Sequence, residues 1–233
     1  MDFLDPLISG KLVKRYKRFM ADVALENGDI VTAHCANTGA MIGVQEPGSE
    51  VWLSPARNPN RKLKYTWELV GVGDGLVGIN TAHPNTIVAE AIESEQIPEL
   101  AGYGGIRREV KYGENSRIDI LLSAEGKPDC YVEIKNVHLM RNRGVAEFPD
   151  SVSTRAAKHQ NELKNMVQQG ARAMTVYLCQ RGDCDTFRLA DDIDPNYAEA
   201  VGIAKKHGVE AVCYDCVLTP KSINIGKPLK IIL

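Results

Sequence analysis

Three charged side chains, Asp119, Glu133 and Lys135, are spaced so that they could act together on a phosphate group. They lie in SRIDILLSAEGKPDCYVEIKNV (residues 116–137), where apolar and polar residues alternate as they do in half-buried strands. A hairpin centred near Gly126 would set Asp119 directly opposite Glu133, with Lys135 two residues along on the same face. Facing carboxylates repel each other. A cation bound between the two carboxylates would remove that cost. The alternative interpretation is a pair of strands whose charged side chains are simply solvated.

Oxygen ligands of this kind indicate which cation could bind. Carboxylates are hard ligands, and with an open coordination sphere they suit Mg²⁺ or Mn²⁺. A lysine beside such an ion could position a water molecule or neutralise charge that develops on a phosphoryl group. The pattern therefore predicts phosphate chemistry that depends on a divalent metal.

The composition limits where anionic partners could bind. The 233 residues carry a formal net charge of −2, with 44% hydrophobic and 25% charged side chains, as in an ordinary globular protein. Attraction to nucleic acid must therefore come from local clusters of cations. No apolar run is long enough to span a membrane, and the first ten residues do not resemble a signal peptide. We interpret the six cysteines as reduced and structural, and therefore expect a cytoplasmic protein. The sequence makes no prediction of oligomeric state.

Residues 1–80 are predicted to form an all-β domain that resembles an OB-fold barrel. About five short strands fit this stretch and no helical period is present. They include Met41–Val44, Val51–Ser54 and Tyr65–Val72, and the pair Asn27-Gly28 is a strong hairpin signal.

Basic residues in this first domain form two clusters that are interleaved with aromatic residues. The cations that we expect to contact nucleic acid are Lys14, Arg15, Lys17, Arg18, Arg61, Lys62 and Lys64. Basic side chains can follow a phosphate backbone while rings such as Phe19 and Trp67 stack on bases, as in OB folds that hold single strands. A solvated charged face, with the aromatic rings in the core, is the alternative.

Residues 81–233 change to a mixed α/β pattern. A helix is expected from His83 to about Glu95, and Glu90 lies within its apolar stripe, where a carboxylate needs a partner. Further strands are expected near 107–112, 173–180 and 209–218, a loop at 140–150, and helices at 151–170 and 195–207. On the first of these two helices, Arg155 and His159 are one turn apart and share a face.

The pattern Asp-x13-Glu-Ile-Lys on adjacent strands resembles the PD-(D/E)xK nuclease superfamily, with Ile118 where the superfamily name has proline. The chain as a whole resembles the sugar fermentation stimulation protein A family. The segments that carry this resemblance are, in order, KRYKRF, NTG, RKLKYTWELV, RIDILL, VEIKNV and RAAKHQNEL. The resemblance implies an N-terminal OB-fold-like barrel followed by a restriction-endonuclease-like α/β domain.

The resemblance also implies roles for individual residues. Asp119 and Glu133, with the carbonyl of Ile134, would bind Mg²⁺ or Mn²⁺, and Lys135 would position or stabilise the attacking water. The superfamily often has an acidic residue on its first helix that faces the site, and Glu90 matches that position.

Residues of the long helix commonly face the scissile phosphate in this superfamily. We therefore expect Arg155 and His159 near the site, although simple surface positions are the alternative for both. The resulting prediction is a DNA-binding protein with a Mg²⁺-dependent nuclease site. An OB fold could hold a single strand, but the sequence does not distinguish single from double strands or DNA from RNA. The alternatives are a largely non-specific DNA-binding regulator that cleaves nothing and is linked to sugar (maltose) metabolism, and a carbohydrate-binding barrel.

Overall fold

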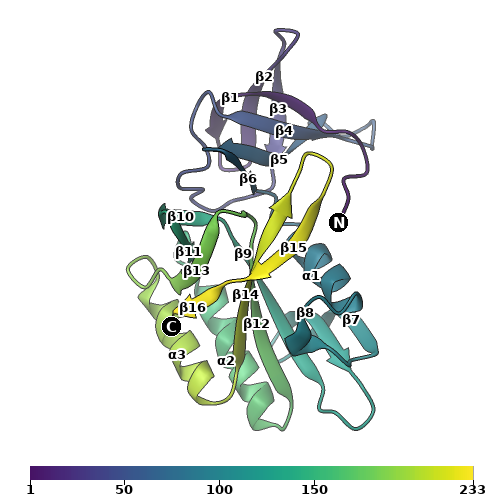
Figure 1. Cartoon of the computed structure of the whole chain (residues 1–233), viewed down its shortest axis with the longest axis vertical. Coiled ribbons are helices and arrows are strands. Elements are labelled where there is room, and N and C mark those ends of the chain that lie inside the picture. Colours follow the sequence, from purple (N-terminus) through teal and green to yellow (C-terminus); the bar gives the residue numbers. More distant parts are fainter. Residues whose placement is uncertain (233) are drawn as a thin grey trace.

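Two units stack along the long axis of the computed structural model, which describes residues 1–232 (Figure 1). The upper unit in this view is a β-barrel, and the lower unit is a mixed sheet with helices on both faces. No helix among the described residues is both long and apolar enough to cross a membrane.

The barrel is built from the first six strands. They are β1 (Ile8–Tyr16), β2 (Met20–Leu25), β3 (Ile30–Cys35), β4 (Glu50–Pro55), β5 (Tyr65–Val72) and β6 (Gly75–Gly78). They pair in the order β3-β2-β1-β4-β5-β6. A further pairing of β3 with β5 closes β1 to β5 into a barrel, and β6 is added along β5. Alternate residues such as Leu12, Val23, Leu53 and Trp67 fill the interior. This closed five-stranded arrangement is the barrel that the alternation predicted.

The strand predicted at Met41–Val44 is wrong. The chain makes a turn there, in which the Val44 N–H donates to the Met41 carbonyl. Met41 has φ of 51°, which no strand residue adopts. Both apolar side chains are buried in the barrel core. The apolar run therefore marks a loop that closes the core, because burial alone does not separate a strand from a packed loop.

The second unit contains three α-helices, a short 3₁₀ helix and the remaining strands. The helices are α1 (Pro84–Glu93), η1 (Pro98–Leu100), α2 (Thr154–Gln168) and α3 (Pro195–Lys206). The strands are β7 (Gly105–Tyr112), β8 (Ser116–Ser123), β9 (Cys130–Val137), β10 (Leu139–Asn142), β11 (Gly144–Phe148), β12 (Arg172–Cys179), β13 (Cys184–Leu189), β14 (Glu210–Leu218), β15 (Ile223–Pro228) and β16 (Lys230–Ile232). Six of them form the main sheet, in the order β15-β14-β12-β9-β8-β7.

Helices cover both faces of the main sheet. The α1 residue Ile87 packs in one core with Ile120 of β8, whereas the α2 residue Leu163 packs in another core with the adjacent strand residue Leu121. Neighbouring residues of a strand point to opposite faces, so α1 and α2 lie on opposite sides of the sheet.

Local signals fix where the long helices begin. The Ser153 hydroxyl accepts the Ala156 N–H at 3.2 Å and so caps α2. At α3, Asp194 caps the Tyr197 N–H at 3.0 Å, and Pro195 occupies the first turn, where its missing N–H costs nothing. The helices predicted at 151–170 and 195–207 are therefore confirmed, with α2 beginning three residues later than predicted.

The loop predicted at 140–150 is wrong, because β10 and β11 occupy most of it. These strands belong to a second sheet, in the order β10-β11-β13-β16. All four strands have six residues or fewer, and β11 pairs in parallel with β13 from about forty residues later. Short strands with distant partners leave little pattern in the local sequence.

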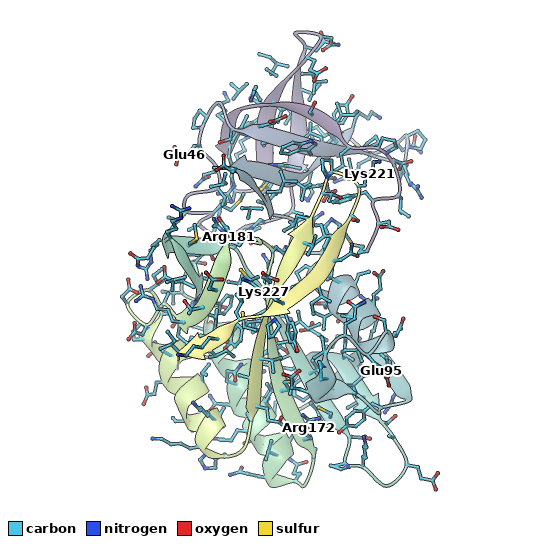
Figure 2. All side chains as sticks on the ribbon, in the orientation of Figure 1. Glu46, Glu95, Arg172, Arg181, Lys221 and Lys227 are labelled. Carbon is cyan, nitrogen blue, oxygen red and sulfur yellow. The ribbon has the colours of Figure 1, made fainter. Side chains whose placement is uncertain are left out.

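Hydrogen bonds join the two units close to the start of α1. The Gly78 N–H at the end of β6 donates to the Gln180 carbonyl at 2.8 Å. The Met41 N–H of the barrel loop donates to the Asp150 carboxylate at 3.0 Å. Arg181, labelled just below the barrel in Figure 2, forms an isolated β-bridge with β6. The barrel loop therefore lies against the second unit.

Candidate functional site

The site predicted from Asp119 and Glu133 lies where β8 and β9 separate. Their ladder ends with Ile120 opposite Val132, and the same register continued by one residue sets Asp119 opposite Glu133. There the Asp119 Oδ2 accepts the Ile134 N–H at 2.7 Å. A side chain thus takes the hydrogen bond that a neighbouring strand would have supplied.

A cavity of about 310 Å³ opens at this point. Its walls come from the start of α1, from β8 and β9, and from the first turns of α2. The polar residues that line it include Asn85, Asp119, Glu133, Lys135, Arg155 and His159. The predicted acids, the lysine and both predicted residues of the long helix therefore meet around one cavity.

Glu133 is the most buried carboxylate of this cavity, with 3% of its surface exposed. Its Oε1 accepts from Lys135 Nζ at 2.7 Å and lies 2.5 Å from His159 Nδ1. Burial raises its pKa, but Lys135 and His159 outweigh burial and hold the pKa below the usual value. Its Oε2 is buried and has no hydrogen-bond partner within residues 1–232. A buried, ionised carboxylate thus keeps one free oxygen.

The pKa of Asp119 is shifted in the opposite direction to that of Glu133. Burial, and secondarily the charge of Glu133, raise its pKa to about 6. Its Oδ1 accepts from Asn85 Nδ2 at 2.9 Å. Two carboxylates therefore share a poorly hydrated space without enough positive charge to neutralise both.

The donor atoms of this cavity fit a hard divalent cation. Glu133 Oε2 is free, Asp119 supplies a second carboxylate, and the Ile134 carbonyl is available because a strand residue directs its N–H and C=O to the same side. Among the described residues, no group of three or more His, Cys, Asp or Glu side chains is arranged to hold a metal. A cation here would therefore complete its coordination with water or substrate oxygens, as Mg²⁺ commonly does.

Residues of α2 form the wall opposite the strands. His159 is buried, and its Nε2 lies 3.4 Å from the Nε of Arg155, whose side chain is exposed at the cavity mouth. Because Nδ1 is held by Glu133, the ring orientation is fixed.

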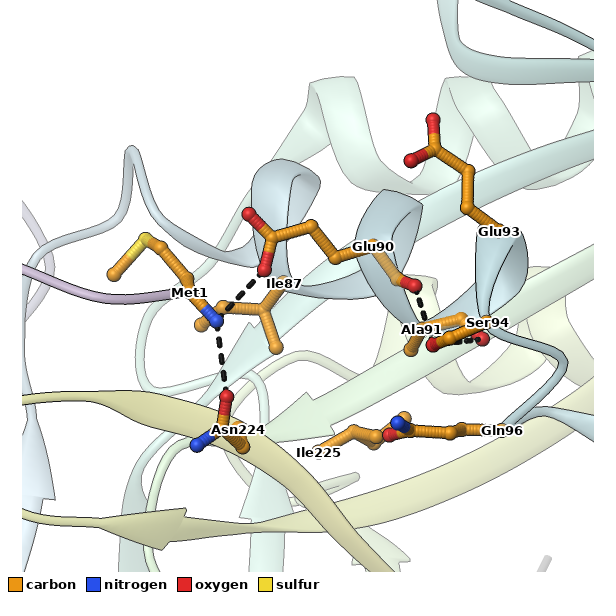
Figure 3. Close-up of a pocket in the computed structure, with 9 residues that line it drawn as sticks. All are labelled: Met1, Ile87, Glu90, Ala91, Glu93, Ser94, Gln96, Asn224 and Ile225. Carbon is orange, nitrogen blue, oxygen red and sulfur yellow. Dashed lines mark hydrogen bonds and ion pairs between the residues drawn. The ribbon is translucent and has the colours of Figure 1, made fainter.

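The structure places Glu90 elsewhere. Its side chain is half exposed and forms an ion pair with the amine of Met1 at 2.7 Å. Figure 3 shows this contact in a separate cavity of about 380 Å³ that Asn224 also lines. Glu90 is five residues from Asn85, which at 3.6 residues per turn places it on a different side of α1.

Asn85 is the polar residue of α1 that lines the cavity, and it is not among the site residues predicted from the sequence. The residue belongs to the His83-Pro84-Asn85-Thr86 segment that opens the helix. A polar residue in the first turn of a helix is so common that its type gave no signal, and only the fold directs this turn at Asp119.

Most barrel cations predicted to bind nucleic acid have partners within the protein. Arg15 donates to the carbonyls of Arg18, Asn37 and Gly39 at 2.9 to 3.0 Å. Arg18 donates through Nε to the Thr38 carbonyl at 3.1 Å. These two arginines hold the loop between β3 and β4, which contacts the second unit through Met41.

The other barrel cations make fewer contacts with the protein. Arg61 donates to the Thr66 hydroxyl, and the Lys64 ammonium donates to the Pro59 carbonyl. Lys14 lies 3.6 Å from Asp22 with 62% of its side chain exposed. The exposed cations for which the structure gives no such contact, within residues 1–232, are Lys17 and Lys62.

Two family models cover almost all of the chain. The model described as the SfsA N-terminal OB domain matches residues 13–79, and the model described as the sugar fermentation stimulation protein RE domain matches residues 82–222. The chain belongs to the sugar fermentation stimulation protein family. The family resemblance and the fold class predicted from the sequence are both confirmed.

Relatives in this family are similar over their full length. The sugar fermentation stimulation protein homolog of Paramagnetospirillum magneticum is 61% identical over 98% of this chain and 97% of its own. That of Rhodospirillum centenum is 58% identical over 99% of both. A solved structure, Pyrococcus furiosus SfsA in complex with Ca²⁺, is 28% identical with a TM-score of 0.89, covering 100% of this chain and 98% of the other.

Proposed function

We propose that this protein is a divalent-metal-dependent phosphodiesterase that acts on nucleic acid. Asp119, Glu133 and the Ile134 carbonyl would hold the ion. The observation that carries the proposal is the free Oε2 of Glu133, a buried and ionised carboxylate beside a second one. The similar protein from Pyrococcus furiosus was solved in complex with Ca²⁺, a cation that also takes oxygen ligands.

A Mg²⁺ or Mn²⁺ ion in this cavity would polarise a phosphodiester oxygen and acidify a bound water. Lys135, fixed against Glu133 at 2.7 Å, places a positive charge in the cavity that stabilises negative charge on the phosphoryl group. Arg155 at the mouth offers donors to a phosphate oxygen.

Asn85 and His159 orient the acids. Asn85 donates to Asp119 and so directs the other carboxylate oxygen towards Ile134. His159 holds Glu133 Oε1 through Nδ1, which leaves the free Oε2 as the oxygen that can bind a ligand. Fixed acids reduce the reorganisation that binding an ion and a phosphate would otherwise require.

The barrel would hold the nucleic acid next to this cavity. Lys14, Lys17 and Lys62 are the exposed cations of its predicted set for which the structure gives no hydrogen bond within residues 1–232, and Phe19, two residues after Lys17, has 48% of its surface exposed. Lysines that follow a phosphate backbone and a ring that can stack on an unpaired base fit a single-stranded DNA segment.

Glu133→Gln tests the metal site, with Glu199→Gln on the exposed face of α3 as the matched control. Calorimetric titration with Mn²⁺ should show affinity reduced about 100-fold in Glu133→Gln and unchanged in the control. Cleavage of single- and double-stranded DNA and of RNA should require Mg²⁺ or Mn²⁺ and disappear in Glu133→Gln. Cleavage that persists in EDTA, or a wild-type protein that binds no divalent cation, would contradict the proposal.

A DNA-binding protein that does not cleave is the second candidate. It is favoured by the contacts of Glu133 Oε1 with Lys135 and His159, which neutralise part of the acidic charge without a metal. Such a protein would bind DNA and Mn²⁺ and leave every substrate intact in the same assays. The relatives' name links the family to sugar fermentation, and this candidate would fit a regulatory role in it.

A further inference from the structure

Two cations face each other across β7 and β8. Lys111 and Arg117 are directly opposed in the antiparallel register, and both side chains are exposed. Like charges at directly opposed positions destabilise a strand pair. Within residues 1–232, the Lys111 ammonium makes no hydrogen bond or ion pair, and Arg117 donates to one neutral group, the Glu109 carbonyl, at 3.0 Å. The structure therefore leaves two adjacent positive charges without an acidic partner.

These cations line a hollow of about 340 Å³ at the end of the β7–β8 hairpin. Tyr112, Gly113, Asn115 and Ser116 complete its lining, which is aromatic at Tyr112 and small or polar elsewhere. Two exposed cations stand at this hollow, which suits a phosphate group better than an apolar ligand.

The hairpin that carries the hollow is fixed in place by α2. The Glu114 N–H donates to Glu162 Oε1 at 3.2 Å, and Lys158 Nζ donates to the Glu114 carbonyl at 2.6 Å. Gly113 has φ of 53°, and a Cβ there would come within 2.9 Å of Glu162. The two cations are therefore presented on a docked turn.

The hollow adjoins the candidate metal site. Arg117 is two residues from Asp119 on β8, a separation of about 7 Å along the strand. Arg117 also binds the carbonyl of Glu109, the β7 residue that the register sets opposite Asp119. A strand of nucleic acid advances about 3.4 Å per phosphate along a duplex axis. The cations therefore lie within one or two phosphates of the acids.

Protection of a sheet edge is the competing explanation, because β7 is the edge strand and charged residues discourage edge-to-edge pairing. That explanation accounts for Lys111. It does not account for Arg117, which lies on the inner strand β8, where an acid or a neutral residue opposite Lys111 would cost less.

We propose that Lys111 and Arg117 form a second phosphate subsite, which binds a backbone phosphate of the nucleic acid beside the one held at the Asp119–Glu133 cavity. The identity of this ligand rests on the proposed function. The subsite itself rests on the opposed, unpaired cations and on the hollow that they line.

The test compares Lys111→Gln/Arg117→Gln with Lys205→Gln/Lys206→Gln, which removes the same charge from α3 on the other side of the second unit (Figure 1). Fluorescence anisotropy with a labelled 20-nucleotide DNA, single- or double-stranded, is measured in EDTA over a range of salt. We expect Kd to rise about tenfold in the first variant, with a salt slope lower by about 1 to 2, and little change in the control.

Lys111→Glu separates binding from folding. The new carboxylate would pair with Arg117, so the unfolding midpoint should stay equal or rise while DNA affinity falls more than tenfold. A Lys111→Glu protein that unfolds earlier than wild type would indicate a structural role and overturn the subsite.

The outcomes distinguish this inference from the proposed function. A wild-type protein that binds no oligonucleotide overturns the proposed function and the ligand together. A wild-type protein that binds DNA, with a double variant that matches the α3 control, overturns the subsite alone. Titration with inorganic phosphate is the last arm, and a variant that loses phosphate binding but keeps DNA affinity overturns the assignment to nucleic acid.

Discussion

The basic clusters of the barrel and the acidic pair of the second unit look alike in the sequence, since each brings like charges together. The fold treats them in opposite ways. In the barrel, Arg15 and Arg18 bind four backbone carbonyls between them and hold a loop. In the second unit, Glu133 keeps a buried oxygen without a partner, and the pKa of Asp119 is raised to about 6 by burial and by its neighbour.

This difference separates structural charges from candidate site charges. A charged side chain that finds its partners within the chain stabilises the fold. A buried charged group that keeps an oxygen without a partner, such as Glu133 Oε2, costs stability, and the cost is tolerated most readily where a ligand offsets it. Unpaired charge, rather than charge density, is therefore the better marker of a site in this protein.

Arg15→Ala should have the largest effect on stability. Arg15 makes four hydrogen bonds, three to backbone carbonyls and one to Gln45, so its loss leaves the loop carbonyls to water. We expect the free energy of unfolding in guanidinium chloride to fall by about 3 kcal/mol. Unchanged stability together with lost DNA binding would show instead that Arg15 belongs with the nucleic-acid contacts.

Asp150→Asn should have the next largest effect, because Asp150 joins the barrel loop to the second unit. Burial raises its pKa, but His138 at 3.3 Å and the Met41 N–H outweigh burial and hold the pKa at about 2. A pKa lowered from 3.8 means that the contribution is present above about pH 4 and is lost as the pH falls towards 2.

At pH 7 this shift corresponds to about 2 kcal/mol. The difference in unfolding free energy between wild type and Asp150→Asn should therefore be largest at neutral pH and shrink between pH 4 and pH 2. Chemical unfolding at three pH values measures it. A difference that stays constant over this range would mean that the Asp150 charge does not join the two units.

The sequence was sufficient for the parts of the molecule that depend on local pattern. Alternation in β8 and β9 predicted the register that sets Asp119 opposite Glu133, and the helices predicted at 151–170 and 195–207 are present as α2 and α3. Family segments spread along the whole chain fixed the two fold classes.

Parts that depend on distant contacts could not be predicted in this way. The pairing of β11 with β13 joins segments far apart, so 140–150 looked like a loop. Glu90 matched a family position by its residue type, yet the helix directs Asn85 at the acids. The partners of Arg15 include backbone carbonyls of a folded loop. Every residue has a backbone carbonyl, so the residue types in the sequence do not predict these contacts.

Asp119→Asn should stabilise the metal-free protein. The substitution removes one of two buried negative charges, and an amide in the same place can still accept the Ile134 N–H and exchange a hydrogen bond with Asn85. We expect the free energy of unfolding to rise by about 1 kcal/mol without metal, while Mn²⁺ affinity falls. Scanning calorimetry with EDTA and with Mn²⁺ measures both, and Asn161→Asp on the exposed face of α2 gives a surface control. A lower melting temperature in EDTA would mean that the two acids do not repel each other.

Lys17→Gly should have the smallest effect on stability and gives the sharpest contrast with Arg15, two residues away. Lys17 is exposed and has φ of 50°, so glycine relieves local strain while it loosens the unfolded chain. These effects oppose each other, and we expect the unfolding free energy to change by less than about 0.5 kcal/mol. DNA affinity should fall about threefold, with a salt slope lower by about 0.7 for one lost phosphate contact on a single strand. Equal losses of stability in Lys17→Gly and Arg15→Ala would remove the distinction between paired and unpaired cations, because both residues would then serve the fold.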